Sequence, residues 1–426
     1  MNHAEIEVII LNDHSSMVGG AESVAIASAI GLAASGTSVT FFSCSGPIDP
    51  SLIGVKNLSV VCTEQDTIAT NRNRALALYQ GIRNTVAISR LRQVLATKSP
   101  DKTVVHVHSW SKALSPFMLD LVVEMGFRLI ITLHDFFIVC PNGSFSILKT
   151  AELCGRSPLS LSCYLCNCDR RNYGHKLWRA LRTTIQNRWL RIPSKTAYFI
   201  GVSDFSLKIA ASFLPKFTPR RTVRHPVFAK NHGPVSVGEN KYFIFIGRFS
   251  EEKGIRVFAK AVQKTGLPAM FIGDGPLMAE IREICPHGIF TGWLSPEAIH
   301  SHLRAARALV FPSLCYETLG LTAIESMAAG VPVILADHCA ATDYIKHDRH
   351  GLHFRRGDVD DLSRQMMRVQ SDQAATVQWG LASYQWYWND PWTSERHVHE
   401  LLEIYNEVCR LPQIAISACC ASKFIQ

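Results

Sequence analysis

Residues 316–334 read YETLGLTAIESMAAGVPVI, and this stretch combines a short helix with the start of a buried strand. Its apolar residues first recur at helical spacing, and Gly330 and Pro332 then end the helix. The run VPVILA (331–336) that follows is rich in β-branched residues, as buried strands are. A helix that leads straight into such a strand is typical of the parallel sheets of α/β proteins.

The rest of the chain repeats this alternation in two series. The strands expected in the first series are 6–11, 38–44, 103–108, 128–133 and 197–203, with helices such as 21–34 and 72–96 between them. The strands expected in the second series are 242–247, 269–275, 289–293, 308–312 and 331–336. Residues 213–240 separate the series and are rich in Pro, Gly and polar residues. We therefore expect two doubly wound, Rossmann-like α/β domains that face a cleft, at 1–212 and 241–385, with 213–240 as the linker.

Length and composition agree with a two-domain globular protein. The chain has 426 residues, of which 47% are apolar and 19% are charged. No apolar stretch is long enough to span a membrane, and the N-terminus does not have the pattern of a signal peptide. The thirteen cysteines are mostly scattered singly, which favours free thiols in a reducing cytoplasm.

The opening stretch also holds two carboxylates, Glu317 and Glu325, eight positions apart. Thr318 is a plausible helix cap, so we expect Glu317 in the loop before the helix and Glu325 on the helix itself. The free amides of Thr318, Leu319, Gly320 and Leu321 would then suit a phosphate, while carboxylates accept bonds from sugar hydroxyls. Together they would fit a sugar joined to a phosphate. The alternative is an ordinary amphipathic helix with two solvated acids.

Two cations and two glycines follow other strands of the second series. GRFSEEKG (247–254) carries Arg248 and Lys253, which at the carboxyl edge of a sheet could neutralise a diphosphate. IGDGP (272–276) places Gly273 and Gly275 in a tight turn. It is not a dinucleotide fingerprint, and the chain has no GxxxxGK[ST] motif for ATP.

These motifs, together with FTGWLSPEAI, ALVFPS and HGLHFRRGD (350–358), resemble those of family 4 of the GT-B glycosyltransferases, the retaining nucleotide-sugar transferases of group 1. The resemblance is strongest from 242 to 360. It departs where Thr318 and Leu319 stand in place of the commoner Gly-Phe, and where Asp343 stands in place of a glutamate.

The resemblance implies a role for each motif. Arg248 and Lys253 would hold the donor diphosphate, Glu325 the nucleotide ribose, and Glu317 the donor sugar beside the reacting centre. The donor would be a nucleoside diphosphate sugar, with no other cofactor and no metal required. A C-terminal segment (386–426) would follow the second domain, and its helix, near 394–410, would cross back to the first domain.

Candidate residues of the first domain lie at strand ends. Gly19 and Gly20, in NDHSSMVGGAES (12–23), would let the backbone approach a ligand closely, or would form only a tight turn. His134 matches the cleft histidine of the family, which contacts the donor sugar. His108 is equally well explained as a cleft or as a structural residue, and Ser203 is a further cleft candidate.

A cysteine cluster follows His134. Cys154, Cys163, Cys166 and Cys168 include a C-x2-C pair, so a zinc or iron–sulfur site is one interpretation. Reduced thiols or a local disulfide in a structural loop are the alternative.

Residues 170–195 contain eight basic residues and no acid. Within 173–195 an apolar stripe is expected at Trp178, Leu181, Ile185, Trp189 and Ile192, with Lys176, Arg179, Arg182 and Arg191 largely off it. A basic amphipathic helix with tryptophans suits an anionic membrane surface, although the stripe could simply pack on the first domain. No nucleic-acid-binding motif accompanies the charge.

The sequence therefore predicts a retaining glycosyltransferase that moves a sugar from a nucleoside diphosphate to an acceptor hydroxyl. The resemblance implies an acceptor in cell-surface polysaccharide or lipid-linked glycan assembly, and a cytoplasmic protein that binds peripherally to the inner face of the membrane. The alternatives are a sugar epimerase or phosphorylase of the same shape, or a non-catalytic protein that binds nucleotide sugars or membranes.

Overall fold

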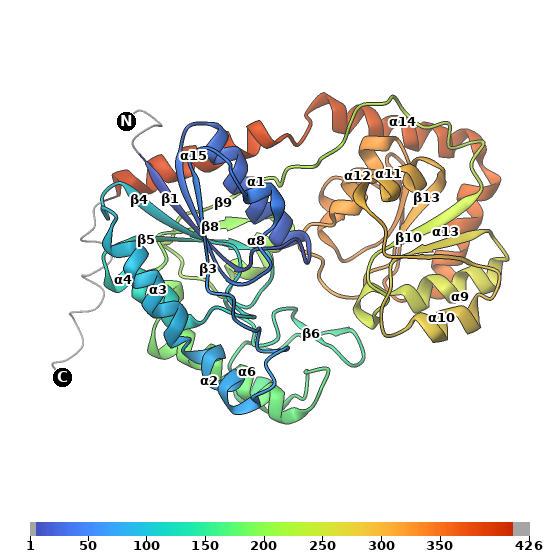
Figure 1. Cartoon of the computed structure of the whole chain (residues 1–426). Helices are drawn as coiled ribbons and strands as arrows, with labels where there is room; N and C mark the ends of the chain where they lie inside the picture. Colours follow the sequence, from blue (N-terminus) through green and yellow to red (C-terminus); the bar gives the residue numbers. More distant parts are fainter. Residues whose placement is uncertain (1–5, 412–426) are drawn as a thin grey trace.

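The computed structural model describes residues 6–411, which form two α/β domains side by side (Figure 1). The first domain is built on a seven-stranded sheet of order β3-β2-β1-β4-β5-β8-β9, in which every pair of neighbours is parallel. Its strands are β1 (Glu7–His14), β2 (Ser38–Ser45), β3 (Leu58–Cys62), β4 (Thr103–Val107), β5 (Arg128–Leu133), β8 (Tyr198–Gly201) and β9 (Arg220–Thr222). The strand order reverses between β1 and β4, so the domain is doubly wound as expected.

Helices cover both faces of this sheet and connect its strands. They are α1 (Gly20–Ala34), α2 (Arg74–Ile82), α3 (Thr85–Ala96), α4 (Pro116–Glu124), α5 (Leu161–Leu165), α6 (Tyr173–Thr184), the π-helical turn η3 (Ile185–Trp189), α7 (Ile192–Lys195) and α8 (Asp204–Ala211). The single helix expected over 72–96 is in fact two. Asn84 separates them, because its buried side chain caps α3 at the Ala87 amide and also bonds the Ala113 carbonyl.

The second domain repeats the plan with a six-stranded parallel sheet of order β12-β11-β10-β13-β14-β15. Its strands are β10 (Tyr242–Ile246), β11 (Ala269–Ile272), β12 (Ile289–Gly292), β13 (Ala306–Phe311), β14 (Val333–Ala336) and β15 (Gly351–Phe354). Its helices are α9 (Ile255–Thr265), α10 (Met278–Ile284), α11 (Pro296–Arg304), α12 (Leu321–Ala329) and α13 (Val359–Ser371). Here the order reverses between β10 and β13.

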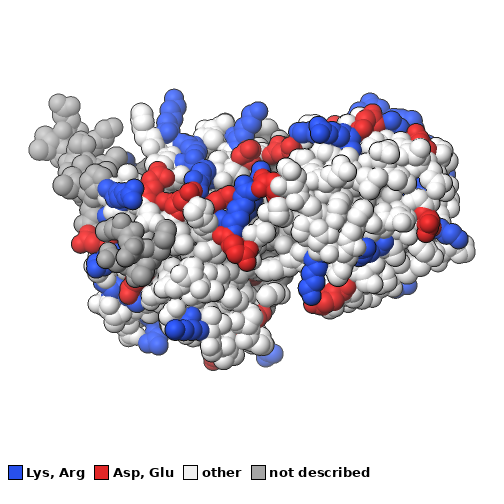
Figure 2. All heavy atoms as spheres, turned by 90° about the horizontal axis from the view of Figure 1, so that it is seen from above, with Lys and Arg blue, Asp and Glu red and all other residues white. Residues whose placement is uncertain are grey.

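The chain crosses between the domains twice. The first crossing has no helix or strand from 223 to 241, and β9 lies inside the stretch that the sequence assigns to the linker. The second crossing joins α14 (Gln373–Asn389), which packs on α12, to α15 (Ser394–Arg410), which packs on α1 and β4. Figure 2 looks down on this side and shows acidic and basic side chains mixed above the junction, which agrees with the ion pairs Arg224–Asp390 and Arg221–Glu403.

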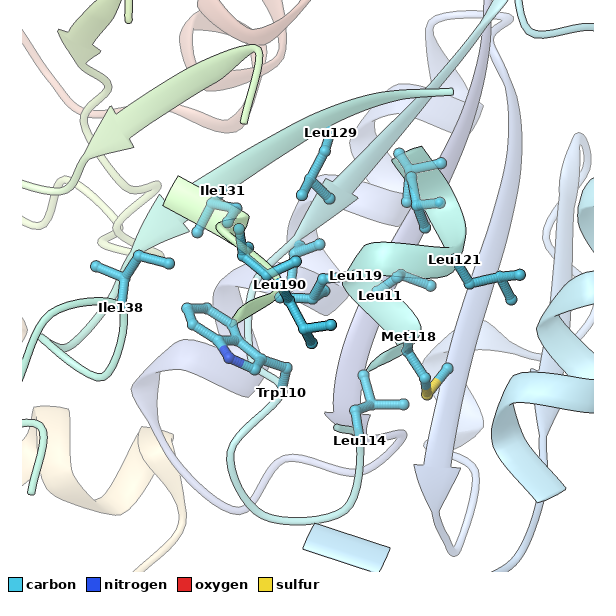
Figure 3. Packing of buried hydrophobic residues seen from close by; sticks show 14 of the residues in the cluster. Leu11, Trp110, Leu114, Met118, Leu119, Leu121, Leu129, Ile131, Ile138 and Leu190 are labelled. Atoms are coloured by element: carbon cyan, nitrogen blue, oxygen red, sulfur yellow. The ribbon is translucent and has the colours of Figure 1, made fainter. Parts of the chain in front are cut away.

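Two apolar layers lie on the faces of the first sheet. In the layer of Figure 3, Trp110, Leu119 and Leu190 converge with side chains of β5 and α4. The indole nitrogen of Trp110 donates to Gln186 Oε1 at 2.8 Å. Because Leu190 and Ile192 are buried here, the end of the basic segment is anchored in the core of the first domain.

Helix α6 differs from the amphipathic helix that the sequence predicts. Lys176 and Arg182, expected on the solvated face, are buried: Lys176 Nζ donates to Cys163 Sγ at 3.3 Å, and Arg182 donates to the Gly81 and Trp110 carbonyls at 2.7 and 2.8 Å. Burial lowers the pKa of Arg182 to about 10. Leu181 and Trp189 lie in solvent instead. The expectation for this face was wrong because distant backbone carbonyls and a thiol, rather than water, bind these cations.

No helix within residues 6–411 is both long enough and apolar enough to cross a membrane.

Candidate active site

The switch point of the second sheet brings two loops together at the carboxyl ends of β10 and β13. The loop after β10 carries Arg248 and Lys253, and the loop after β13 carries Glu317 and leads into α12. In doubly wound sheets ligands bind at this position, because the flanking helices depart in opposite directions and leave a crevice.

The turn with Gly273 and Gly275 supports the loop of Arg248. Phe249 N donates to Asp274 O at 2.9 Å, and Gly247 N donates to Ile272 O at 3.0 Å. A Cβ atom on Gly273 would lie 2.0 Å from the Gly247 carbonyl oxygen. These glycines therefore permit close packing of two loops, and they leave the Arg248 side chain exposed, with no ion pair within residues 6–411.

Lys253 and Glu317, expected to bind different parts of the donor, form an ion pair with each other. Ser313 Oγ donates to the same carboxylate oxygen, Glu317 Oε1, at 3.0 Å. Burial opposes the charge of Lys253, but the adjacent Glu317 carboxylate raises the pKa of the lysine above its ordinary value. A bound diphosphate would therefore share Lys253 with Glu317.

Gly254 fixes the turn after Lys253. Its φ is +69°, and a Cβ atom there would lie 1.8 Å from the Pro312 carbonyl oxygen. We expect Gly254→Ala to lower the free energy of unfolding by about 3 kcal/mol, because both strain and steric overlap act at this site.

Gly266 provides the matched control, since it lies at the other end of α9 with φ +66° and nothing within 4 Å of an added Cβ. Gly266→Ala should lower the free energy of unfolding by only about 1–2 kcal/mol. Urea denaturation of both variants measures the difference, and equal losses would contradict the role of the Pro312 contact.

Helix α12 begins later than the sequence predicts. Its N-cap is Gly320, with φ +82°, and Thr318 caps nothing because its hydroxyl donates to the His134 carbonyl of the first domain at 2.9 Å. Within residues 6–411 no acceptor takes the amide protons of Leu319, Gly320 or Leu321. These amides lie at the positive end of the helix dipole and can bind an anion.

Glu325 lies on the first turns of α12 and has no hydrogen bond or ion pair with any described side chain. Burial raises the pKa of this carboxyl above its ordinary value. Because no described group bonds the carboxylate oxygens of Glu325, these oxygens are available as acceptors for hydroxyl groups of a ligand.

The first domain brings its own switch-point residues to the same place. A Cβ atom on Gly20 would lie 3.5 Å from Leu321 Cδ1, so the Gly19–Gly20 loop lies close to the start of α12. Ser203 Oγ donates to the Thr318 carbonyl at 2.6 Å, while it also caps α8. Ser203 thus connects the two domains through Thr318.

The first-domain histidines differ in position. His134 is partly exposed and lies beside Thr318, whereas His108 is 2% exposed and lies behind His134, with its Nδ1 atom 2.9 Å from His134 Nε2. Burial lowers the pKa of His134 to about 3, so its ring is neutral.

Sequence reasoning missed three residues at this site. Ser313 bonds Glu317, Asp343 accepts the Phe205 amide across the domains at 2.9 Å, and His225 packs its ring 5.0 Å from that of His134. His225 contacts a residue distant in sequence, so no local pattern indicates it. Ser313 lies in the motif ALVFPS, four positions before Glu317, but the motif does not show that the two side chains bond. Asp343 was noted only as a departure from the family.

The cysteine cluster does not have the arrangement of a metal site. Within residues 6–411 no three His, Cys, Asp or Glu side chains are grouped so that they could hold a metal, and no disulfide joins Cys154, Cys163, Cys166 or Cys168. Cys163 accepts a bond from Lys176, Cys154 accepts one from Arg156, and burial raises the pKa of Cys168 to about 11. The structure thus gives these cysteines as separate thiols, and two of the four sulfurs, those of Cys154 and Cys163, accept bonds from cations.

Residues 229–386 match the family model described as glycosyl transferases group 1. O-antigen chain mannosyltransferase C of Escherichia coli is 32% identical over 142 residues, which cover 32% of this chain and 38% of that protein. The matched segments span 31 to 39% of the first four curated relatives.

Solved structures match over nearly the whole chain. Sucrose-phosphate synthase from Thermosynechococcus elongatus has a TM-score of 0.70 at 17% identity and covers 95% of this chain and 99% of its own. HepE from Anabaena, solved with UDP and glucose, has a TM-score of 0.66 at 13% identity and covers 94% of this chain and 100% of its own. At this identity the likeness concerns the fold, which is the two-domain GT-B arrangement.

Proposed function

Since its second domain matches the family model of the glycosyl transferases group 1 and the whole chain has the GT-B fold, we propose that this protein transfers a sugar from a nucleoside diphosphate to an acceptor hydroxyl, with retention of configuration. One observation carries the proposal. Lys253 pairs with Glu317 at the switch point of the second sheet, next to the amides before α12 that no group within residues 6–411 bonds, and the Thr318 hydroxyl of the same loop bonds the His134 carbonyl of the first domain.

We assign each group a role in donor binding that is consistent with its hydrogen bonds and ion pairs. Arg248 and Lys253 would bind the diphosphate, together with the amides of Leu319 to Leu321, so no metal is needed to neutralise it. Glu325, which has no hydrogen-bond or ion-pair partner in the described part of the chain, would accept the ribose hydroxyls. Glu317, held by Lys253 and Ser313, would face the donor sugar.

The same pocket could serve an epimerase or a phosphorylase, and the products distinguish these activities. An epimerase needs no acceptor, and a phosphorylase consumes inorganic phosphate. Transfer that depends on an added acceptor and releases a nucleoside diphosphate supports the proposal, and the anomeric signal of the product in NMR tests retention. The similarity to an O-antigen mannosyltransferase supports a cell-surface or lipid-linked glycan as the acceptor.

Arg248→Ala tests the diphosphate site. Losing a charge-assisted bond is expected to weaken donor binding about tenfold to a hundredfold, which corresponds to about 1.5–3 kcal/mol. The measurement is the thermal shift of the protein with UDP-, GDP- and dTDP-sugars, followed by titration of the donor that stabilises it. Arg349 is the control, since it is exposed but precedes β15, at the opposite edge of the sheet. Equal donor affinity in Arg248→Ala and Arg349→Ala would contradict the assignment.

The proposal includes a membrane surface on the side of the first domain where α2 and α6 lie in Figure 1. Helix α6 exposes Tyr173, Leu177 and Leu181 at intervals of four residues, and the exposed fractions of Leu181 and Trp189 are 50% and 74%. Neighbouring helix α5 exposes Leu161 and Leu165. An uncovered apolar helix face of this kind is unusual on a monomer and indicates a binding surface.

Charge indicates which surface it would bind. The segments 67–100 and 170–203, which meet where α2 packs on α6, contain no acidic residue. Arg171, Arg188 and Arg191 are exposed and form no ion pair within residues 6–411. Apolar side chains flanked by unpaired arginines suit the anionic lipids of the inner face of a membrane.

Neutralising Arg171, Arg188 and Arg191 together should lower binding to vesicles that contain phosphatidylglycerol about a hundredfold, at about 1 kcal/mol for each cation. Flotation with these vesicles and with pure phosphatidylcholine vesicles measures the effect. A matched variant neutralises Arg282, Arg349 and Arg355 of the second domain and should bind normally. Equal vesicle binding by both triple variants would refute the membrane surface. Binding of the protein to nucleic acid but not to vesicles would show that the surface recognises another ligand.

A further inference from the structure

A group of buried histidines lies behind His134. His106 and His108 come from the end of β4, His225 from the first crossing and His397 from α15, and none of these four is more than 4% exposed. The ring centroids of His108 and His225 lie 5.1 and 5.0 Å from that of His134, so both rings pack on it. The orientation of His134 therefore depends on residues that do not themselves reach the cleft.

One hydrogen bond joins His134 to this group. His108 Nδ1 lies 2.9 Å from His134 Nε2. Burial lowers the pKa of both rings below the ordinary value, so both are neutral near pH 7 and each carries one N–H. In a bond between two neutral imidazoles one ring donates and the other accepts.

The other nitrogen of His108 indicates which ring donates. His108 Nε2 is buried and has no hydrogen-bond partner among the described residues 6–411. Its neighbour His106 cannot serve, because Tyr405 Oη and Thr132 Oγ1 bind its two ring nitrogens at 2.7 Å each. Buried N–H groups without an acceptor are rarer than unpaired acceptors, so the proton of His108 belongs on Nδ1, where it is donated to His134 Nε2.

The proton of His134 must then lie on its own Nδ1. This atom makes no hydrogen bond within residues 6–411 and is not among the buried polar atoms that lack a partner, so it is accessible to solvent or to a ligand.

We infer that His108 is a positioning residue, which holds His134 in the Nδ1–H tautomer and so makes it a hydrogen-bond donor toward an oxygen atom of the ligand in the cleft. That the oxygen belongs to a donor sugar or its phosphate rests on the proposed function. The tautomer itself rests only on the geometry of the two rings. His108 thus acts through His134 and does not touch the ligand.

NMR of the full chain labelled with nitrogen-15 at histidine tests the tautomer without any assay of activity. Protonated and bare ring nitrogens have well-separated shifts, and His134→Gln and His108→Asn spectra assign the two rings. The expected result is a protonated Nδ1 and a bare Nε2 for His134. A His134 ring protonated at Nε2 in the unsubstituted protein would overturn the inference.

Kinetics test the consequence. His108→Leu removes the bond and should lower kcat about tenfold to a hundredfold, the range typical when a residue that orients a functional histidine is lost, with the donor KM changed less than about threefold. His108→Asn keeps a polar group near the position of Nδ1 and should restore kcat to within about threefold. A His108→Leu enzyme of normal kcat, or a folded His108→Asn enzyme as slow as His108→Leu, would refute the positioning role.

His134→Ala separates this failure from failure of the proposed function. Full transfer activity in His134→Ala would remove the assigned role of His134, while the NMR experiment would still decide the tautomer. If His108→Leu does not fold, as its melting temperature would reveal, the His108→Asn kinetics and the spectra remain decisive.

Discussion

Glu317→Gln is expected to lower kcat for sugar transfer about a hundredfold to a thousandfold while donor binding changes less than about threefold. Positive charge develops on the donor sugar as its bond to the phosphate breaks, and a carboxylate in the position proposed for Glu317 would stabilise the transition state more than the ground state. Glutamine keeps the size and hydrogen-bonding capacity of the side chain but removes the charge. Initial rates and calorimetric titration of the donor measure the two effects separately.

Two matched variants define what this result means. Glu325→Gln should raise the donor KM more than it lowers kcat, because its assigned contact is with the ribose in both the ground and the transition state. Ser313→Ala removes the hydrogen bond that Ser313 Oγ donates to Glu317 at 3.0 Å. It should lower kcat less than Glu317→Gln does. Unchanged turnover in Glu317→Gln would refute the catalytic assignment.

Acid is expected to destabilise the fold by about 4 kcal/mol between pH 7.5 and pH 5 through two buried histidines alone. Burial lowers the pKa of His106 to about 3 and that of His397 to about 4, from an unfolded value of 6.5. Below pH 6.5 the two histidines therefore bind protons in the unfolded chain but remain neutral in the folded chain. The stability that these rings contribute is fully present above pH 6.5 and is lost as the pH falls toward the folded values, at about 2 kcal/mol for each ring at pH 5.

Carboxyl groups whose pKa is raised by burial, namely Asp135, Glu325 and Asp343, oppose this trend. Burial raises the pKa of Asp135 to about 6 from 3.8, so the folded state binds a proton there before the unfolded state does. This offsets about 1–1.5 kcal/mol by pH 5. Urea unfolding at a series of pH values should still show a net loss of stability.

His106→Gln isolates one of the two rings. Whatever its stability at pH 7.5, this variant should lose about 2 kcal/mol less than the unsubstituted protein on transfer to pH 5. His399→Gln is the control for replacing a histidine by glutamine, since His399 is exposed on α15. The same pH dependence in His106→Gln and in the unsubstituted protein would contradict the account.

Local patterns predict much of this fold. Runs of β-branched and apolar residues mark most strands of both sheets, and the expected C-terminal helix near 394–410 corresponds to α15 at Ser394–Arg410. The short strands β3, β9 and β15 escape this reasoning, and β9, which reads RRT, carries no apolar pattern at all. Its place at the edge of the first sheet comes from pairing with β8.

The candidate site, like the fold, could be predicted from the sequence only in part. Sequence motifs indicate Arg248, Lys253, Glu317 and Glu325, because the loops at strand ends of a doubly wound sheet must meet at its carboxyl edge. They do not indicate that Lys253 and Glu317 pair, or that the Thr318 hydroxyl bonds the His134 carbonyl. Each of these contacts joins residues at least 64 positions apart, so no local spacing contains them.

Helix α6 is the clearest example of what the sequence alone could not predict. The sequence by itself determined the alternation of strands and helices, the two domains and the chemical types gathered at the cleft, because these depend on periodicity and on the geometry of parallel sheets. Only the tertiary structure decided which face of α6 is buried. Periodicity predicts the buried face of a helix from the hydropathy of its side chains alone. In the structure the carbonyls of Gly81 and Trp110 accept hydrogen bonds from Arg182, so this cation can be buried. Leu181 lies in solvent instead.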